Sequence, residues 1–177
     1  MRLVLVSHGA TSATRRAAFP EDEPLERPDL VLPDPLRADV TFCTPALRCV
    51  QTANALGLRP QQTDALRDCD YGKWQGRTLD EVAADDPAAV HTWLTDPTAA
   101  PHGGESTQDF LTRVGAWLDT LPRDHHRVAV VTTPAVVKAA VVHAILAPPA
   151  SFWRVDIPPL SRTVLSGHPT SWTLGLG

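Results

Sequence analysis

The sequence predicts a single α/β domain over residues 1–177, with three layers: a mostly parallel sheet and helices on both of its faces. Short apolar runs typical of buried strands alternate with segments whose apolar residues recur at helical spacing. A chain of 177 residues fits one domain with a sizeable core. We find neither an internal repeat nor a linker-like segment, so a second domain is not expected.

Four segments predict the strands of this sheet. Residues 2–6 and 127–132 are nearly continuous apolar runs, as expected of strands that are covered on both faces. Residues 39–43 predict another strand, and residues 154–174 offer two or three short candidates.

Helices are predicted at about residues 13–18, 45–56, 87–94, 107–121 and 134–146. Thr44 followed by Pro45 is typical of a helix start, with Thr44 as the N-cap, and Gly57 ends that helix. Asp86 precedes a proline in the same way, and Ser106 opens a capping box.

The pocket of such a fold is expected at the carboxyl ends of its parallel strands. His8 follows the first strand, and Thr133 follows the strand at residues 127–132. We therefore expect a ligand to bind between these two segments.

The composition argues against several classes of partner. The net charge is −4, and no run of Lys or Arg is long enough to indicate a nucleic acid. No apolar run approaches the roughly 18–20 residues of a membrane span, and the first one is too short for a signal peptide. We expect a cytoplasmic protein without a membrane partner.

Cys43, Cys49 and Cys69 are odd in number and lack the spacing of metal ligands, which favours free thiols. The neighbouring His125 and His126 lack a third ligand at metal-like spacing. We therefore expect no metal and no other cofactor.

Five segments, in order along the chain, resemble the motifs of one enzyme family. They are residues 5–11 (LVSHGAT), 43–53 (CTPALRCVQTA), 66–76 (LRDCDYGKWQG), 103–106 (GGES) and 130–138 (VVTTPAVVK). With these matches the chain resembles the histidine phosphatase superfamily, which includes cofactor-dependent phosphoglycerate mutase and α-ribazole phosphatase. The resemblance covers most of the chain and implies a phosphoglycerate mutase-like fold.

The resemblance also implies roles for individual residues. His8 matches the histidine that attacks phosphorus and becomes a phosphohistidine, and Arg48 matches an arginine that holds the phosphoryl group. Asp68 stands where the family has the glutamate that protonates the leaving oxygen, with Asp70 as a nearby competitor.

Three positions depart from the family pattern. Ser7 replaces an arginine beside the nucleophile, Thr133 replaces a second histidine, and Thr14 stands where many members have asparagine. The pocket thereby loses one permanent cation and one imidazole, and removing a single preorganised donor typically costs about 10²–10³ in rate.

Four residues are candidates to replace the missing groups. Arg15 or Arg16 could turn inward, and His102 precedes a loop that borders the pocket in relatives. Lys138 matches a family arginine, for which we expect a structural role. The candidates for substrate binding are thus Ser7, Thr11, Thr14, Arg15, Arg48, His102 and Thr133, with His8 and Asp68 as the catalytic pair.

Residues 19–36 form a proline-rich loop that can be neither a helix nor a central strand. In relatives the equivalent region helps cover the active site. Here the loop is acidic, which would disfavour highly anionic substrates.

Three functional hypotheses remain open. The first is a small-molecule phosphomonoesterase that uses His8 as nucleophile in a thinned phosphate pocket. The second is an enzyme of another class, in which His8 acts as general acid or base and Arg48 holds a carboxylate or another anion. The third is a non-catalytic relative that binds a ligand. The expected partner is a small phosphorylated or carboxylated molecule, and a homodimer is left open.

Overall fold

The computed structural model describes residues 1–32, 34–122 and 126–175. His125 and the end of the predicted domain, residues 176–177, lie outside the described residues. The predictions made for them stay predictions.

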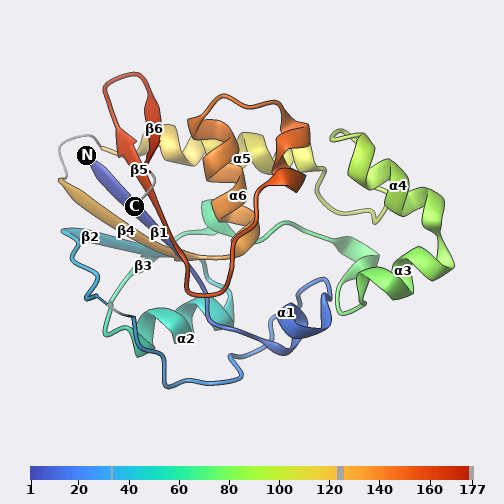
Figure 1. The fold of residues 1–177 in the computed structure, drawn as a ribbon, viewed down its shortest axis with the longest axis horizontal. Helices are drawn as coiled ribbons and strands as arrows, with labels where there is room; N and C mark the ends of the chain where they lie inside the picture. The colour runs from blue at the N-terminus through green and yellow to red at the C-terminus, as the bar shows by residue number, and fades with distance from the viewer. Residues whose placement is uncertain (33, 123–125, 176–177) are drawn as a thin grey trace.

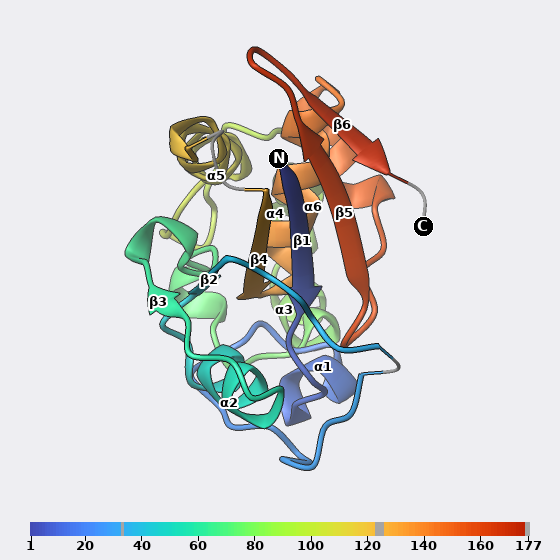
Figure 2. The same ribbon diagram turned by 90° about the vertical axis from the view of Figure 1, so that its left-hand side faces the viewer.

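A mixed sheet forms the centre of the molecule. Within the described residues it contains β1 (Arg2–Ser7), β2 (Val40–Cys43), β3 (Gln61–Gln62), β4 (Arg127–Thr132), β5 (Arg162–Gly167) and β6 (Trp172–Gly175). Their order is β3-β2-β4-β1-β5-β6, and Figure 2 shows β4, β1 and β5 side by side. β3, β2, β4 and β1 run parallel, whereas β5 is antiparallel to β1 and to β6.

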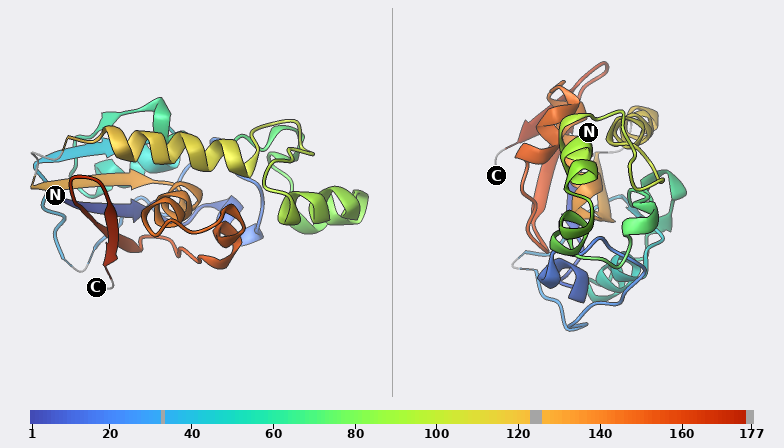
Figure 3. Two further views of the ribbon diagram at one scale, coloured as in Figure 1. Left: turned by 90° about the horizontal axis from the view of Figure 1, so that it is seen from above. Right: turned by 90° about the vertical axis from the view of Figure 1, so that its right-hand side faces the viewer.

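Helices cover both faces of this sheet. They are α1 (Ser12–Arg16), α2 (Leu47–Ala55), α3 (Leu79–Asp85), α4 (Pro87–Thr95), α5 (Thr107–Thr120) and α6 (Pro134–Ala144), with short 3₁₀ turns η1 (Asp64–Leu66), η2 (Gly72–Trp74) and η3 (Pro149–Arg154). α5 and α6 lie on one face and α2 lies on the other, whereas α1 lies beyond the carboxyl end of β1 (Figures 1 and 3). The predicted α/β class with a mostly parallel sheet is confirmed.

The predicted helix starts are confirmed at two places and wrong at a third. The side chains of Asp86 and Ser106 cap α4 and α5 as expected. Thr44 is not an N-cap, because its backbone N–H donates to Val131 O at 3.2 Å and continues the strand. α2 begins later, and Asp22 Oδ1 accepts a hydrogen bond from the N–H of Leu47 at 2.7 Å, so the proline-rich loop satisfies the helix start.

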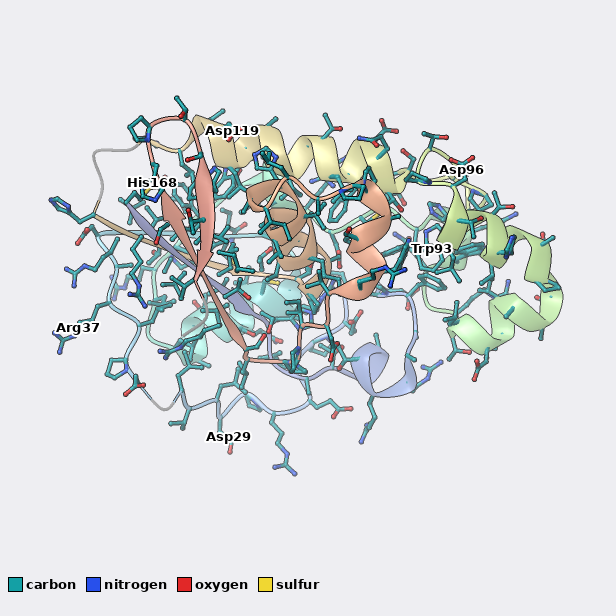
Figure 4. All side chains as sticks on the ribbon, turned by 45° about the horizontal axis from the view of Figure 1, so that its top comes forward. Asp29, Arg37, Trp93, Asp96, Asp119 and His168 are labelled. Atoms are coloured by element: carbon teal, nitrogen blue, oxygen red, sulfur yellow. The ribbon has the colours of Figure 1, made fainter. Side chains whose placement is uncertain are left out.

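The α3–α4 hairpin extends from the carboxyl end of the sheet, and α3 was not predicted from the sequence. A capping box of Thr78 and Glu81 starts α3. Trp93, labelled in Figure 4, packs from α4 against Trp153 of η3, with ring centroids 4.2 Å apart. This contact fixes the hairpin beside the segment that follows α6.

The core lies between the sheet and α5 and α6. Leu5, Trp74, Phe110 and Leu118 are among its fully buried side chains. The free thiols of all three cysteines are also buried. In the part of the chain that the structure describes, no helix is both long enough and apolar enough to cross a membrane.

Candidate active site

A cleft of about 190 Å³ opens at the carboxyl ends of β1 and β4. The polar or charged residues that line it are His8, Thr14, Glu23, Asp68, Thr133 and Lys138. Tyr71, Phe152 and Trp153 supply aromatic surface. The cleft therefore lies where the sequence predicted it, between the segments that follow the first strand and the strand at residues 127–132.

His8 stands at the head of this cleft and is almost fully buried. Its Nδ1 lies 2.7 Å from Gly9 O. Because a carbonyl oxygen only accepts, Nδ1 carries the proton and Nε2 keeps its lone pair. Burial is the largest cause that lowers the pKa of His8 below its ordinary value, and the positive charge of Arg48 lowers it further. The imidazole is therefore neutral near pH 7.

The His8 loop is held by α2. Gly9 N–H donates to Thr52 Oγ1 at 3.0 Å, and the Thr52 hydroxyl donates to Arg48 O at 2.7 Å. A side chain on Gly9 would approach Leu30 within 3.0 Å, so the proline-rich loop closes tightly over this turn. Thr52 was not singled out from the sequence, although it belongs to the matched segment 43–53.

Arg48 connects three parts of the site from a buried position on α2. Its Nε donates to His8 Nε2 at 3.2 Å, its Nη2 donates to Asp68 Oδ2 at 2.5 Å, and its Nη1 donates to Glu21 O at 2.6 Å. Burial disfavours the charged guanidinium, but attraction to Asp68 and Glu23 outweighs it, so the pKa of Arg48 is raised. Arg48 is a permanent cation at the nucleophile.

Asp68 joins Arg48 to the first turn of α6. Its Oδ1 accepts from Thr133 Oγ1 and from the N–H of Cys69, both at 3.0 Å. Asp70, its competitor in the sequence, is exposed and its Oδ1 accepts from Gly72 N–H at 2.9 Å. Of the two aspartates, the geometry thus brings Asp68 to the cleft.

Thr133 is the N-cap of α6, and its Oγ1 accepts a hydrogen bond from Val136 N–H at 3.3 Å. Thr133, Pro134 and Ala135 all line the cleft. The positive end of the α6 dipole consequently faces the cleft, which favours an anion there.

The Asp68 loop is fixed from behind by Arg113 of α5. The Arg113 guanidinium makes a bidentate pair with Glu105, with distances of 2.8 and 2.7 Å. It also donates to the carbonyl oxygens of Ala65 and Arg67 at 2.9 and 3.1 Å. One planar side chain therefore ties α5, the loop before it and the segment that carries Asp68.

Ser7 and Arg15, two predicted binding residues, are not brought to the cleft. The Ser7 hydroxyl donates to Pro158 O at 2.6 Å and accepts from Ser161 N–H at 3.1 Å, so it faces the segment before β5. Arg15 pairs with Glu26, and 72% of its side chain is exposed. Arg15 does not replace the missing cation in this arrangement.

Thr11 and Thr14 stabilise the start of α1. Thr14 N–H donates to the Thr11 hydroxyl oxygen at 3.3 Å, and Thr11 N–H donates to the Thr14 hydroxyl oxygen at 2.9 Å. Thr14 also lines the cleft, whereas the buried Thr11 hydroxyl donates to Glu23 Oε1 at 3.0 Å. Thr11 therefore acts on the cleft through Glu23.

His102 is buried away from the cleft. Its Nδ1 accepts from Gly104 N–H at 3.0 Å, and its ring packs on Tyr71 and Trp74. Its Nε2 has no hydrogen-bond partner among the described residues. Burial lowers the pKa of His102, so this imidazole is a neutral packing group.

Glu23 was missed as a site residue in the sequence, and Lys138 was named as a candidate replacement but expected to be structural. Glu23 lies 3.8 Å from Arg48 Nη1, and its Oε2 accepts from Glu21 N–H at 2.9 Å. Lys138 nevertheless lines the cleft. Its spacing from Pro134 could have revealed this, because residues i and i+4 share one face of a helix.

Comparisons with known proteins identify the family and the fold of the chain. Residues 31–176 match the family described as the histidine phosphatase superfamily, branch 1. The matched range begins after His8. Curated mycobacterial relatives are matched over only 18% to 31% of their own length. One of them, the glucosyl-3-phosphoglycerate phosphatase of Mycobacterium tuberculosis, is 41% identical over 64 residues, which are 36% of this chain and 29% of that protein.

Two solved structures share the fold over nearly the whole chain. The mycobacterial glucosyl-3-phosphoglycerate phosphatase complexed with VO₃ has a TM-score of 0.85 at 27% identity, covering 99% of this chain and 97% of that one. The α-ribazole phosphatase of Shigella flexneri has a TM-score of 0.83 at 22% identity, covering 99% of this chain and 95% of that one.

Proposed function

The chain belongs to the histidine phosphatase superfamily, and from that premise we propose that it is a small-molecule phosphomonoesterase with His8 as its nucleophile. One observation carries the proposal. The Nδ1 proton of His8 is bound to Gly9 O at 2.7 Å, which leaves Nε2 as a neutral nucleophile at the cleft. Relatives named as phosphatases of α-ribazole and of glucosyl-3-phosphoglycerate support a small phosphoester as substrate.

In the proposed first step, His8 Nε2 attacks phosphorus and the bond from phosphorus to the ester oxygen breaks. The Nε–H of Arg48 leaves Nε2 and binds a phosphoryl oxygen, where it stabilises the charge of the transition state together with the start of α6. The leaving oxygen takes a proton that Asp68, itself a carboxylate paired with Arg48, relays from the monoanionic phosphoester. Water then attacks the phosphohistidine, both of its protons leave with the phosphate as dihydrogen phosphate, and the imidazole is restored.

The charge of the cleft limits the substrate. Glu23 and Asp68 both line the cleft and would repel a second phosphate. We therefore infer a small substrate with one phosphate.

The test is a panel of phosphomonoesters followed by a search for acid-labile phosphohistidine. The wild-type protein is expected to release phosphate and to form the adduct, and His8→Ala is expected to do neither while remaining folded. If no adduct forms and vanadate does not bind, the phosphatase proposal is wrong.

A second candidate function is favoured by the tight contact between Arg48 and His8. Arg48 Nε donates a hydrogen bond to His8 Nε2 at 3.2 Å. Ser7 stands in place of an arginine, so no second cation there helps a phosphoryl group to displace this hydrogen bond. In this case His8 acts as general acid or base on a carboxylate held by Arg48. Absence of phosphohistidine together with tight binding of simple carboxylates would support this function over the phosphatase.

A further inference from the structure

Lys138 is a cation of the cleft that the proposed chemistry does not use. It lies on α6 and lines the same cavity as His8. Its Nζ is 5.7 Å from the centroid of the Phe152 ring, a cation–π distance. Among the described residues, none has a carboxylate within ion-pair distance of this ammonium.

Burying an ammonium group by half without a carboxylate partner is unfavourable. Burial lowers the pKa of Lys138, and attraction from the more distant Asp156 opposes this only in part. An anion that entered the cleft beside Lys138 would therefore compensate for the hydration that the ammonium loses on burial.

The position of Lys138 along α6 separates it from the phosphoryl site. Thr133, at the start of the helix, touches Asp68. Lys138 comes five residues later in the sequence, which corresponds to a rise of about 7.5 Å along a helix. Side chains of a helix lean toward its N-terminus, so the ammonium reaches back over the cleft. A ligand bound at His8 would meet Lys138 with its other end.

The charges of the cleft indicate which anion would bind there. Lys138 carries a single positive charge, and Glu23 and Asp68 line the same cavity. A carboxylate matches one ammonium, whereas a second phosphate would add a dianion next to two carboxylates.

We infer that Lys138 and Phe152 form a subsite for a carboxylate, so that the preferred substrates are phosphomonoesters of small carboxylic acids. The preference among phosphomonoester substrates rests on the proposed phosphatase function, whereas the binding of a carboxylate at Lys138 does not. The carboxylate receives the Lys138 charge, and the ring of Phe152 shields that ion pair from water.

Equilibrium binding of phosphonates tests the subsite without any turnover. The probes are two matched pairs: 3-phosphonopropionate with propylphosphonate, and 4-phosphonobutyrate with butylphosphonate. Within at least one pair, the wild-type protein is expected to bind the carboxylated member about tenfold more tightly. Lys138→Gln is expected to bring this ratio close to one, and Lys138→Arg to keep it.

Lys73→Gln is the matched control, since Lys73 is the other lysine of the chain and is exposed. It is expected to keep the wild-type ratio. The inference is wrong if neither pair shows a preference in the wild-type protein, or if Lys138→Gln weakens both members of a pair equally. A Lys138-dependent preference without phosphohistidine would uphold the subsite and overturn the phosphatase function, so the two failures are distinguishable.

Discussion

Arg48 Nε donates a hydrogen bond to His8 Nε2 at 3.2 Å, so the guanidinium occupies the lone pair of the nitrogen that would attack phosphorus. The other two nitrogens of the guanidinium are held by Asp68 and Glu21. A phosphoryl oxygen must therefore take the Nε–H of Arg48 before His8 can react. In this arrangement, binding of the substrate phosphate to Arg48 also frees His8 Nε2 for the attack.

Replacing Arg48 with lysine should slow formation of the phosphohistidine. Lysine keeps the charge but cannot hold His8, Asp68 and a phosphoryl oxygen with one planar group. We expect kcat to fall by about 10²–10³, measured as the single-turnover rate of adduct formation. Arg67→Lys changes an exposed arginine of the neighbouring segment and serves as the control. An Arg48→Lys rate within threefold of the wild-type rate would contradict the role given to Arg48.

The dependence of kcat/KM on pH should report the buried state of His8. Burial lowers the pKa of His8, so the neutral imidazole persists below its ordinary value of about 6.5. We expect activity to be constant through pH 6.5 and to fall only at lower pH. If kcat/KM already decreases above pH 7 as the pH is lowered, His8 is not neutral in the way described.

The free energy of unfolding should also depend on the protonation of His8. Since the folded-state pKa of His8 lies below the unfolded value, the unfolded chain binds the proton more tightly. The contribution of His8 to the free energy of unfolding is thus fully present above about pH 6.5 and is lost as the pH falls below it. His8→Asn should remove this part of the pH dependence in urea titrations, with wild-type protein as the reference.

Asp68 and Glu23 can be distinguished as proton donors by the leaving group. Asp68→Asn should reduce hydrolysis of an alkyl phosphate at least tenfold more than hydrolysis of p-nitrophenyl phosphate, whose leaving group needs no proton. Glu23→Gln should lower both rates by a similar factor, because Glu23 faces Arg48 and Thr11. The reverse result would assign the proton to Glu23.

Removing Arg113 should affect stability and activity together. Arg113→Leu leaves Glu105 without its bidentate partner and breaks the bonds to Ala65 and Arg67. We expect the free energy of unfolding to fall by about 2–3 kcal/mol, measured by urea denaturation. Because Asp68 loses support, kcat should fall more than KM rises. An unchanged kcat in the folded variant would show that Arg113 acts on stability alone.

Much of the fold, and the part of the site around His8, could be predicted from the sequence, because both depend on local patterns. The apolar runs placed β1 and β4, and the residues that follow them, His8 and Thr133, were correctly expected to meet at one edge. Asp68 was also preferred over Asp70, and the structure brings Asp68 to Arg48.

The remaining parts of the site depend on contacts between distant segments. The direction of the Ser7 side chain is set by Pro158, which is 151 residues away in the sequence. Glu23 reaches the cleft only because the proline-rich loop folds over Arg48. No periodicity within such a loop determines its path, so neither placement could be read from local sequence. Lys138 is different, since the helical spacing from Pro134 contained the necessary information.

The reactivity of the buried cysteines can report local opening of the structure. Burial raises the pKa of Cys43 to about 12 and raises those of Cys49 and Cys69 as well. A thiol with a raised pKa reacts slowly with alkylating reagents, because the thiolate is the reactive form. Cys43 and Cys49 share a small apolar cluster with Ala53 and Val131, at the contact of α2 with β4. Alkylation at Cys43 and Cys49 should therefore follow the separation of α2 from the sheet, and its rate would measure how often the support of Arg48 comes apart.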